Sequence, residues 1–275
     1  MARFFEQFVA FGTDSVGLER LMRFIQSIFA ILTFYPTLIP MFLSQQPLSV
    51  HKTTELAMFE LSSHLNLTRR AIRLFWCLGS FQSSWTAYGA PAKSIEIWLS
   101  IMADSFFALF GLMESVTLPD LLHTNHFSIF GYDEAVKIDG QSQGLWLAAL
   151  SCAILSSGIK IFRAFAYRAV PESGSAFGAS GQDEKDGAAG DKTSKAAVEK
   201  RKKEREALAR ENSRKIRALT RKFAAEVLDI VIPAWSSGLA SIELGTVAIA
   251  MFLSTLLTGF AVWERCGMEI DGKRG

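Results

Sequence analysis

The sequence predicts an all-α, membrane-associated protein with amphipathic helices and one or two transmembrane helices. The segment 244–263 is 20 residues long and carries no charge. As a helix it reaches about 30 Å, which is the thickness of the hydrocarbon core of a bilayer. Of the 29 lysines and arginines, 14 lie between residues 185 and 222, so the rest of the chain is more apolar than its average. Apolar residues elsewhere recur at helical spacing, and no segment alternates in the manner of a strand.

The first amphipathic helix is expected over 18–32. Asp14 or Ser15 can cap its start, and Pro36 ends it. Its apolar residues recur every three or four positions, so they share one side of the helix. The polar residues on the opposite side are Glu19, Arg23 and Gln26. A second helix is expected over 53–61.

A basic amphipathic helix is predicted over 63–88, in which three arginines fall on one polar arc. Held inside a transmembrane span, these arginines cost together roughly 8–10 kcal/mol. A helix that lies flat on the membrane avoids that cost, so we expect Arg69, Arg70 and Arg73 to contact lipid headgroups. The alternative is a surface helix packed on a soluble core. The residues expected to insert into the membrane are Leu67, Ile72, Leu74, Phe75, Trp76, Leu78 and Phe81.

Three long apolar segments differ in how well they suit a bilayer. The span 244–263 is the strongest, and Trp263 marks an interface at its end. The span 144–162 is second, with Lys160 near one end. The segment 94–113 carries two carboxylates, each of which costs about 2.5–3.5 kcal/mol at the bilayer centre. We therefore expect 94–113 to be interfacial or packed on other helices.

The chain is expected to divide into four parts. Residues 1–170 form a helical, membrane-associated region, and 171–194 form a flexible linker rich in Gly, Ser and Ala. Residues 195–222 form a charged helix, which is either solvated or in contact with anionic lipid or a partner. Residues 223–275 form a C-terminal membrane segment with a short tail.

No motif in the sequence supports catalysis, so we expect no enzyme and no cofactor. His123 and His126 are the best metal candidates, but they fall in a polar loop and lack a clear third ligand. Cys77, Cys152 and Cys266 are scattered, which predicts reduced thiols and no zinc site. The net charge of +2 gives no reason to expect a nucleic-acid partner.

The stretches LTRRAIRLFWCLGSF, SIMADSFFALFGLM and RKFAAEVLDIVIPAWSSGLASIELGTVAIAMFLSTLLTGFAVW occur in this order, and together they resemble the peroxin-eleven family of peroxisomal membrane proteins. LTRRAIRLFWCLGSF resembles the family's basic helix. SIMADSFFALFGLM resembles its apolar segment with a central acid and a closing Gly-Leu. RKFAAEVLDIVIPAWSSGLASIELGTVAIAMFLSTLLTGFAVW resembles its C-terminal block, which leads through an Asp and a Pro into a glycine-containing span. The resemblance covers nearly the whole chain apart from residues 171–200.

The resemblance implies a protein of the peroxisomal membrane, with both termini in the cytosol, that elongates the membrane before fission and so controls peroxisome number and size. Insertion of the basic helix into anionic lipid would drive the elongation. The implied partners are the fission machinery, the import receptor for membrane proteins and further copies of the chain. The alternative is a pore for small metabolites, which needs an oligomer because few spans are available.

Overall fold

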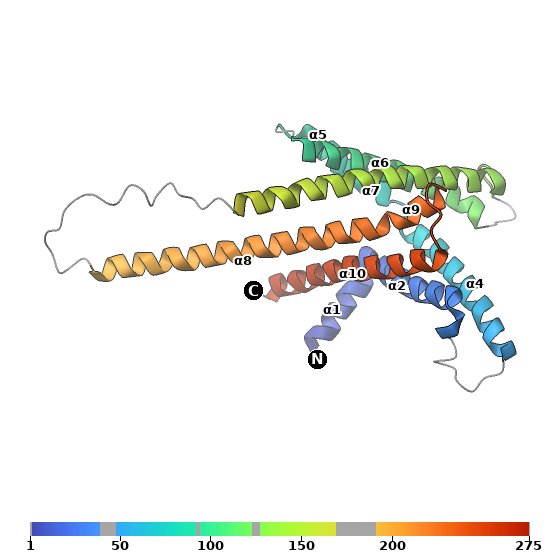
Figure 1. The fold of residues 1–275 in the computed structure, drawn as a ribbon, viewed down its shortest axis with the longest axis horizontal. Helices are drawn as coiled ribbons and strands as arrows, with labels where there is room; N and C mark the ends of the chain where they lie inside the picture. The colour runs from blue at the N-terminus through green and yellow to red at the C-terminus, as the bar shows by residue number, and fades with distance from the viewer. Residues whose placement is uncertain (1, 39–47, 92–93, 123–126, 169–190, 275) are drawn as a thin grey trace.

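The computed structural model describes residues 2–38, 48–91, 94–122, 127–168 and 191–274 (Figure 1). Within these residues every regular element is a helix, which confirms the all-α prediction. The elements are α1 (Ala2–Thr13), α2 (Ser15–Phe34), the 3-10 turn η1 (Pro36–Leu38), α4 (Leu48–Ile72), α5 (Trp76–Gly89), α6 (Ile95–Leu121), α7 (Tyr132–Arg168), α8 (Asp191–Asp229), α9 (Val231–Ser236) and α10 (Leu244–Arg274).

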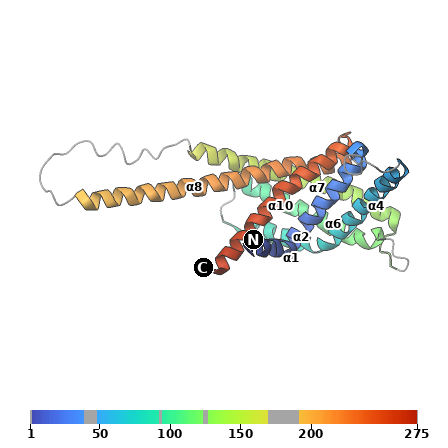
Figure 2. The same ribbon diagram turned by 90° about the horizontal axis from the view of Figure 1, so that it is seen from below.

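Six of the helices form a closed ring. Each contacts the next in the order α6, α7, α8, α10, α2 and α4, and α4 returns to α6. α5 packs outside the ring on α6, and the short α9 contacts α7, α8 and α10. Figure 2 shows α10, α2 and α4 side by side, while the N-terminal half of α8 extends away from the bundle. The ring brings α2, from the N-terminal part of the chain, and α10, from its C-terminal part, together around a common interior.

Three helices of the described part are long and apolar enough to cross a membrane: α6, α7 and α10. The predicted spans 144–162 and 244–263 lie within α7 and α10. α6 includes most of the segment expected to be interfacial or packed on other helices, and it does pack along α5 and α7. The two carboxylates of the segment 94–113 have hydrogen-bond donors on these neighbouring helices. Asp104 accepts a 2.6 Å hydrogen bond from Ser83 of α5, and Glu96 accepts one of 2.8 Å from Arg163 of α7.

The interior of the ring holds many charged and polar side chains, and many large apolar side chains are exposed on its periphery. The expected helix over 18–32 lies within α2, and the Asp14 carboxylate caps α2 by accepting from the Gly17 amide at 3.3 Å. The charged and amide side chains of α2 face inward. The division of α2 into an apolar side and a polar side was therefore predicted correctly. The polar side faces the interior of the ring, however, whereas in a soluble amphipathic helix it faces water. The buried polar residues of α2 are Glu19, Arg23, Gln26 and Ser27. Such inverted polarity is what a protein surrounded by lipid requires.

Some predicted boundaries differ from the structure. The charged helix predicted over 195–222 is part of α8, which begins at Asp191 and ends at Asp229. Of the predicted linker, residues 171–190 lie outside the described residues, and so do His123 and His126. The helix predicted over 63–88 is not continuous, because α4 ends at Ile72 and α5 begins at Trp76.

Tertiary contacts explain this break. Here α5 crosses α6 so closely that a Cβ added to Gly111 would lie 3.2 Å from the Cβ of Cys77. The turn also frees the carbonyl of Leu74, which accepts a 2.6 Å hydrogen bond from the Ser115 hydroxyl of α6. Both contacts depend on α6, so a helical wheel drawn for this segment alone gives no sign of the break.

Replacing Gly111 by leucine is expected to push α5 away from α6 and to destabilise the protein by about 1–3 kcal/mol, as overpacking does. Thermal unfolding in detergent, followed by circular dichroism, measures the change. Gly79→Leu on α5 is the matched control, since a Cβ at Gly79 meets nothing within 4 Å. Equal stability of the two variants would show that the Gly111 contact does not hold α5 in place.

Candidate functional site: a buried charge network and an exposed apolar stripe

The Glu19 carboxylate lies at the centre of a network of arginines inside the ring. Its side chain is completely buried. Arg69 of α4 donates to it from Nε at 2.9 Å and from Nη2 at 2.6 Å. Arg20 and Arg73 form longer ion pairs with it, at 3.5 and 3.7 Å. One carboxylate thus faces several guanidinium groups, and α2 is joined to α4 through these contacts.

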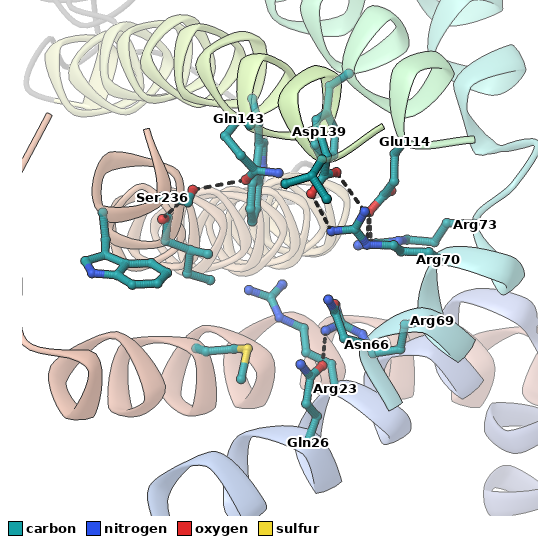
Figure 3. A pocket seen from close by; sticks show the side chains of 17 residues that line it. Arg23, Gln26, Asn66, Arg69, Arg70, Arg73, Glu114, Asp139, Gln143 and Ser236 are labelled. Carbon is teal, nitrogen blue, oxygen red and sulfur yellow. Dashed lines mark hydrogen bonds and ion pairs between the residues drawn. The ribbon is translucent and has the colours of Figure 1, made fainter. Parts of the chain in front are cut away.

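Two further carboxylates, from α6 and α7, complete the network on its other side (Figure 3). Arg70 donates two hydrogen bonds to Asp139, at 2.7 and 3.0 Å. Arg73, in the turn between α4 and α5, donates to Glu114 at 2.6 Å. These charge-assisted bonds fix the end of α4 against α6 and α7, two of the three candidate spans.

The C-terminal half of the chain contributes one more buried pair. Arg23 of α2 forms an ion pair with Asp229 at the end of α8, and both side chains are largely buried. Arg23 also donates to the Ser254 hydroxyl of α10 at 3.3 Å. The network therefore takes its charged groups from α2, α4, α6, α7 and α8, so it holds most of the ring together.

The arginines determine the protonation of Glu19. Burial by itself raises the pKa of this carboxyl, but the charges of Arg20, Arg69, Arg73 and Arg23 outweigh it and lower the pKa to about 2. Glu19 is thus an anion at any physiological pH. The folded protein depends on this charge, because the arginines around it are themselves buried.

In this arrangement Arg69, Arg70 and Arg73, the predicted headgroup contacts, form ion pairs within the protein. Arg69 is only 5% exposed, and all three guanidinium groups face protein carboxylates inside the ring. The prediction counted no acid within the segment 63–88, and the carboxylates come from other helices. Contact with lipid stays a prediction, and it requires these pairs to open.

Beyond the break, α5 exposes a stripe of large apolar side chains. The spacing of three or four residues places them on one side of the helix. We define the α5 stripe as Phe75 (70% exposed), the residue just before α5, together with Leu78 (61%), Phe81 (40%), Trp85 (77%) and Tyr88 (52%) on the helix itself. Contiguous exposed apolar surface of this kind marks a site of contact with a membrane or a partner.

The α5 stripe overlaps the predicted membrane-inserting set only in part. Phe75, Leu78 and Phe81 are in both. The other four predicted residues, Leu67, Ile72, Leu74 and Trp76, are half-buried in the structure. Sequence reasoning missed Trp85 and Tyr88, although both continue the three-or-four-residue spacing beyond Phe81.

The carboxylates of the network were also missed as functional residues. Glu19 and Glu114 are acids on helices that are otherwise largely apolar, and such residues are usually paired with an opposite charge. That signal marks Glu19 and Glu114, but it does not tell which arginine each one meets, and it does not mark Asp139, which follows two other acids on α7, or Asp229, which ends the highly charged α8. Among the described residues no group of three His, Cys, Asp or Glu side chains is placed to hold a metal.

Comparison with known proteins assigns the family. The family profile described as Peroxisomal biogenesis factor 11 (PEX11) matches residues 5–263, which include the charge network and the α5 stripe. No curated protein and no solved structure matches the chain. The family is one of biogenesis factors and is not known for enzymes. The chain therefore belongs to the Peroxisomal biogenesis factor 11 family, the peroxisomal membrane proteins that act in peroxisome proliferation.

Proposed function

We propose that this protein resides in the peroxisomal membrane and elongates it before fission by inserting the α5 stripe into one leaflet, and in this way controls peroxisome number and size. The single observation that carries the proposal is the exposure of five large apolar side chains on one side of α5. Fully burying an exposed large apolar side chain contributes about 1.5–3 kcal/mol, and each of these, being 40–77% exposed, contributes a corresponding part of that gain. This gain is large enough to drive insertion of the stripe into lipid.

The length of α5 favours a flat orientation. Its 14 residues form a helix of about 21 Å, which is shorter than the hydrocarbon core of a bilayer. A helix of this length with one apolar side lies in the interface, where it enters a single leaflet. Each inserted copy expands that leaflet relative to the other, so several copies in one patch bend the membrane into a tube.

The charge network fixes the position of the inserted helix. Arg70 and Arg73 tie the end of α4 to α6 and α7, and α5 begins three residues after Arg73. Bending stress on α5 is therefore passed to the candidate spans. If the network opens on an anionic membrane, Arg69, Arg70 and Arg73 can exchange carboxylates for lipid phosphates, as predicted from the sequence.

The test is tubulation of anionic liposomes by the full-length chain, viewed by electron microscopy. Replacing Leu78, Phe81 and Trp85 by serine is expected to abolish tubulation while incorporation into the liposomes is unchanged. The matched control replaces Gly79, Gln82 and Thr86 by serine, because these residues are exposed on the same helix but lie outside the α5 stripe. Normal tubulation by the stripe variant would refute the proposal.

A second candidate function is an oligomeric pore for small metabolites. The observation that favours it is the polar interior of the ring, where α6 and α7 present Glu114 and Asp139 to the arginines. Charged groups inside a membrane protein commonly line a path for solutes. Solute flux across proteoliposomes at low protein density, unaffected by the stripe variant, would favour the pore over membrane shaping.

A further inference from the structure

A cavity of about 470 Å³ lies inside the ring, beside the charge network (Figure 3). Its volume is in the range of small-molecule sites. Helices α2, α4, α6, α7, α9 and α10 all contribute to its wall. Its most distinctive feature is that four arginines line it, namely Arg23, Arg69, Arg70 and Arg73.

These guanidinium groups have more donors than the network uses. Each guanidinium carries five N–H groups. The Nε atoms of Arg23, Arg70 and Arg73 are buried, and within the described residues they have no hydrogen-bond partner. The Nε atom of Arg70 is only in ion-pair range of Glu114, at 3.5 Å. Buried donors without an acceptor are rare in folded proteins, so several of them beside one cavity show that the carboxylates of the network do not saturate these guanidinium groups.

The charges around the cavity favour an anion. The four arginines of the wall face only two carboxylates in the wall, Glu114 and Asp139. When Arg20, Glu19 and Asp229 are added, the network holds five cationic and four anionic groups. One positive charge is left without a counter-charge, and arginine forks match the geometry of phosphate oxygens.

The rest of the wall suits an organic phosphate. Polar donors and acceptors stand near the arginines, and two indole rings provide apolar surface for a carbon skeleton. In Figure 3, Gln143 and Ser236 lie across the cavity from Arg23, and the Ser236 hydroxyl donates to Gln143 Oε1 at 3.2 Å. The wall residues that supply these polar groups and indole rings are Asn66, Gln143, Ser236, Trp146 and Trp235.

We infer that this cavity is a binding site for a phosphate group, carried either by a small soluble phosphomonoester or by the headgroup of an anionic phospholipid. The phosphate oxygens accept from guanidinium N–H groups of the four arginines that line the cavity and neutralise the excess positive charge. The site is separate from the α5 stripe, and the inference does not rest on membrane bending. By this inference the interior of the ring binds a ligand in addition to holding the helices together.

The first arm of the test uses the full-length protein in micelles of an uncharged detergent. Glycerol 3-phosphate and inorganic phosphate are titrated separately, and binding is followed by tryptophan fluorescence, because Trp146 and Trp235 line the cavity. The second arm presents vesicles of phosphatidylcholine with and without phosphatidic acid. Binding in the first arm identifies a soluble phosphate, and a response to phosphatidic acid alone identifies a lipid headgroup.

Gln143→Glu is the diagnostic variant. It keeps the oxygen that accepts from Ser236 and adds a negative charge to the wall, so phosphate binding is expected to weaken at least about tenfold. Gln82→Glu adds the same charge on the exposed side of α5 and is expected to bind like the unchanged protein. Absence of binding in both arms, or equal binding by the two variants, overturns the inference.

Discussion

Replacing Glu19 by glutamine is expected to destabilise the protein by about 3–5 kcal/mol, because it leaves buried arginines without their central carboxylate. Arg69 is the residue most affected, since Glu19 accepts two of its hydrogen bonds. In a protein of this size the loss corresponds to a decrease in Tm of roughly 6–20 °C. Thermal unfolding in detergent, followed by circular dichroism, measures this decrease in Tm.

The control for this variant is Glu134→Gln. Glu134 forms an exposed pair with Lys137 on α7, and both side chains are more than half exposed. Such pairs contribute at most about 1 kcal/mol. A Glu19 variant as stable as the Glu134 variant would show that the buried network does not stabilise the fold.

The pH dependence of stability gives an independent check on Glu19. Its pKa falls from 4.5 to about 2 on folding, so the ionised form is favoured in the folded state. The resulting contribution of Glu19 to the free energy of unfolding amounts to about 3 kcal/mol. It is fully present above about pH 4.5 and is lost as the pH falls toward 2. The Glu19→Gln variant lacks this contribution. The difference in free energy of unfolding between the unchanged protein and this variant, followed by acid unfolding, should therefore decrease as the pH falls over that interval.

The second large effect is expected at the pair between Arg23 and Asp229. Asp229→Leu alone should cost about 3–5 kcal/mol, because Arg23 then remains buried without its carboxylate. The double variant Arg23→Met, Asp229→Leu should recover most of that loss, since an apolar pair of similar volume replaces a buried ion pair at little cost. Chemical unfolding of the single and double variants, as a mutant cycle, measures the recovery.

A matched control is available on the same helix. Glu211 pairs with Lys215 at the surface of α8, and both side chains are exposed by more than half. Glu211→Leu is therefore expected to change stability by less than about 1 kcal/mol. A double variant no more stable than Asp229→Leu would mean that Asp229 acts through contacts other than Arg23.

The helices themselves were largely predictable from local signals. The spacing of apolar residues, the Asp14 cap and Pro36 are all close in sequence, and they define α2 within a few residues. The long apolar runs in α7 and α10 were found in the same way. Which side of α2 faces inward was not predictable from the wheel, because that depends on whether water or lipid surrounds the protein.

The contacts of the arginines in the segment 63–88 could not be predicted from neighbouring residues in the sequence. Arg69 meets a residue 50 positions away, and Arg70 meets one 69 positions away. The break before α5 likewise depends on the crossing with α6 and not on a proline or glycine within the turn. The sequence thus predicted that these arginines share one side of a helix, and the fold determines that this side meets carboxylates.

The pairing of Arg23 with a partner 206 residues away has a consequence for synthesis of the protein. A nascent chain exposes this arginine until α8 has left the ribosome, so the ring can close only on a finished polypeptide. Any premature stop before Asp229 leaves a cation that no later residue neutralises. Truncated copies are therefore expected to keep this arginine without its carboxylate, and only complete copies can bury it as an ion pair.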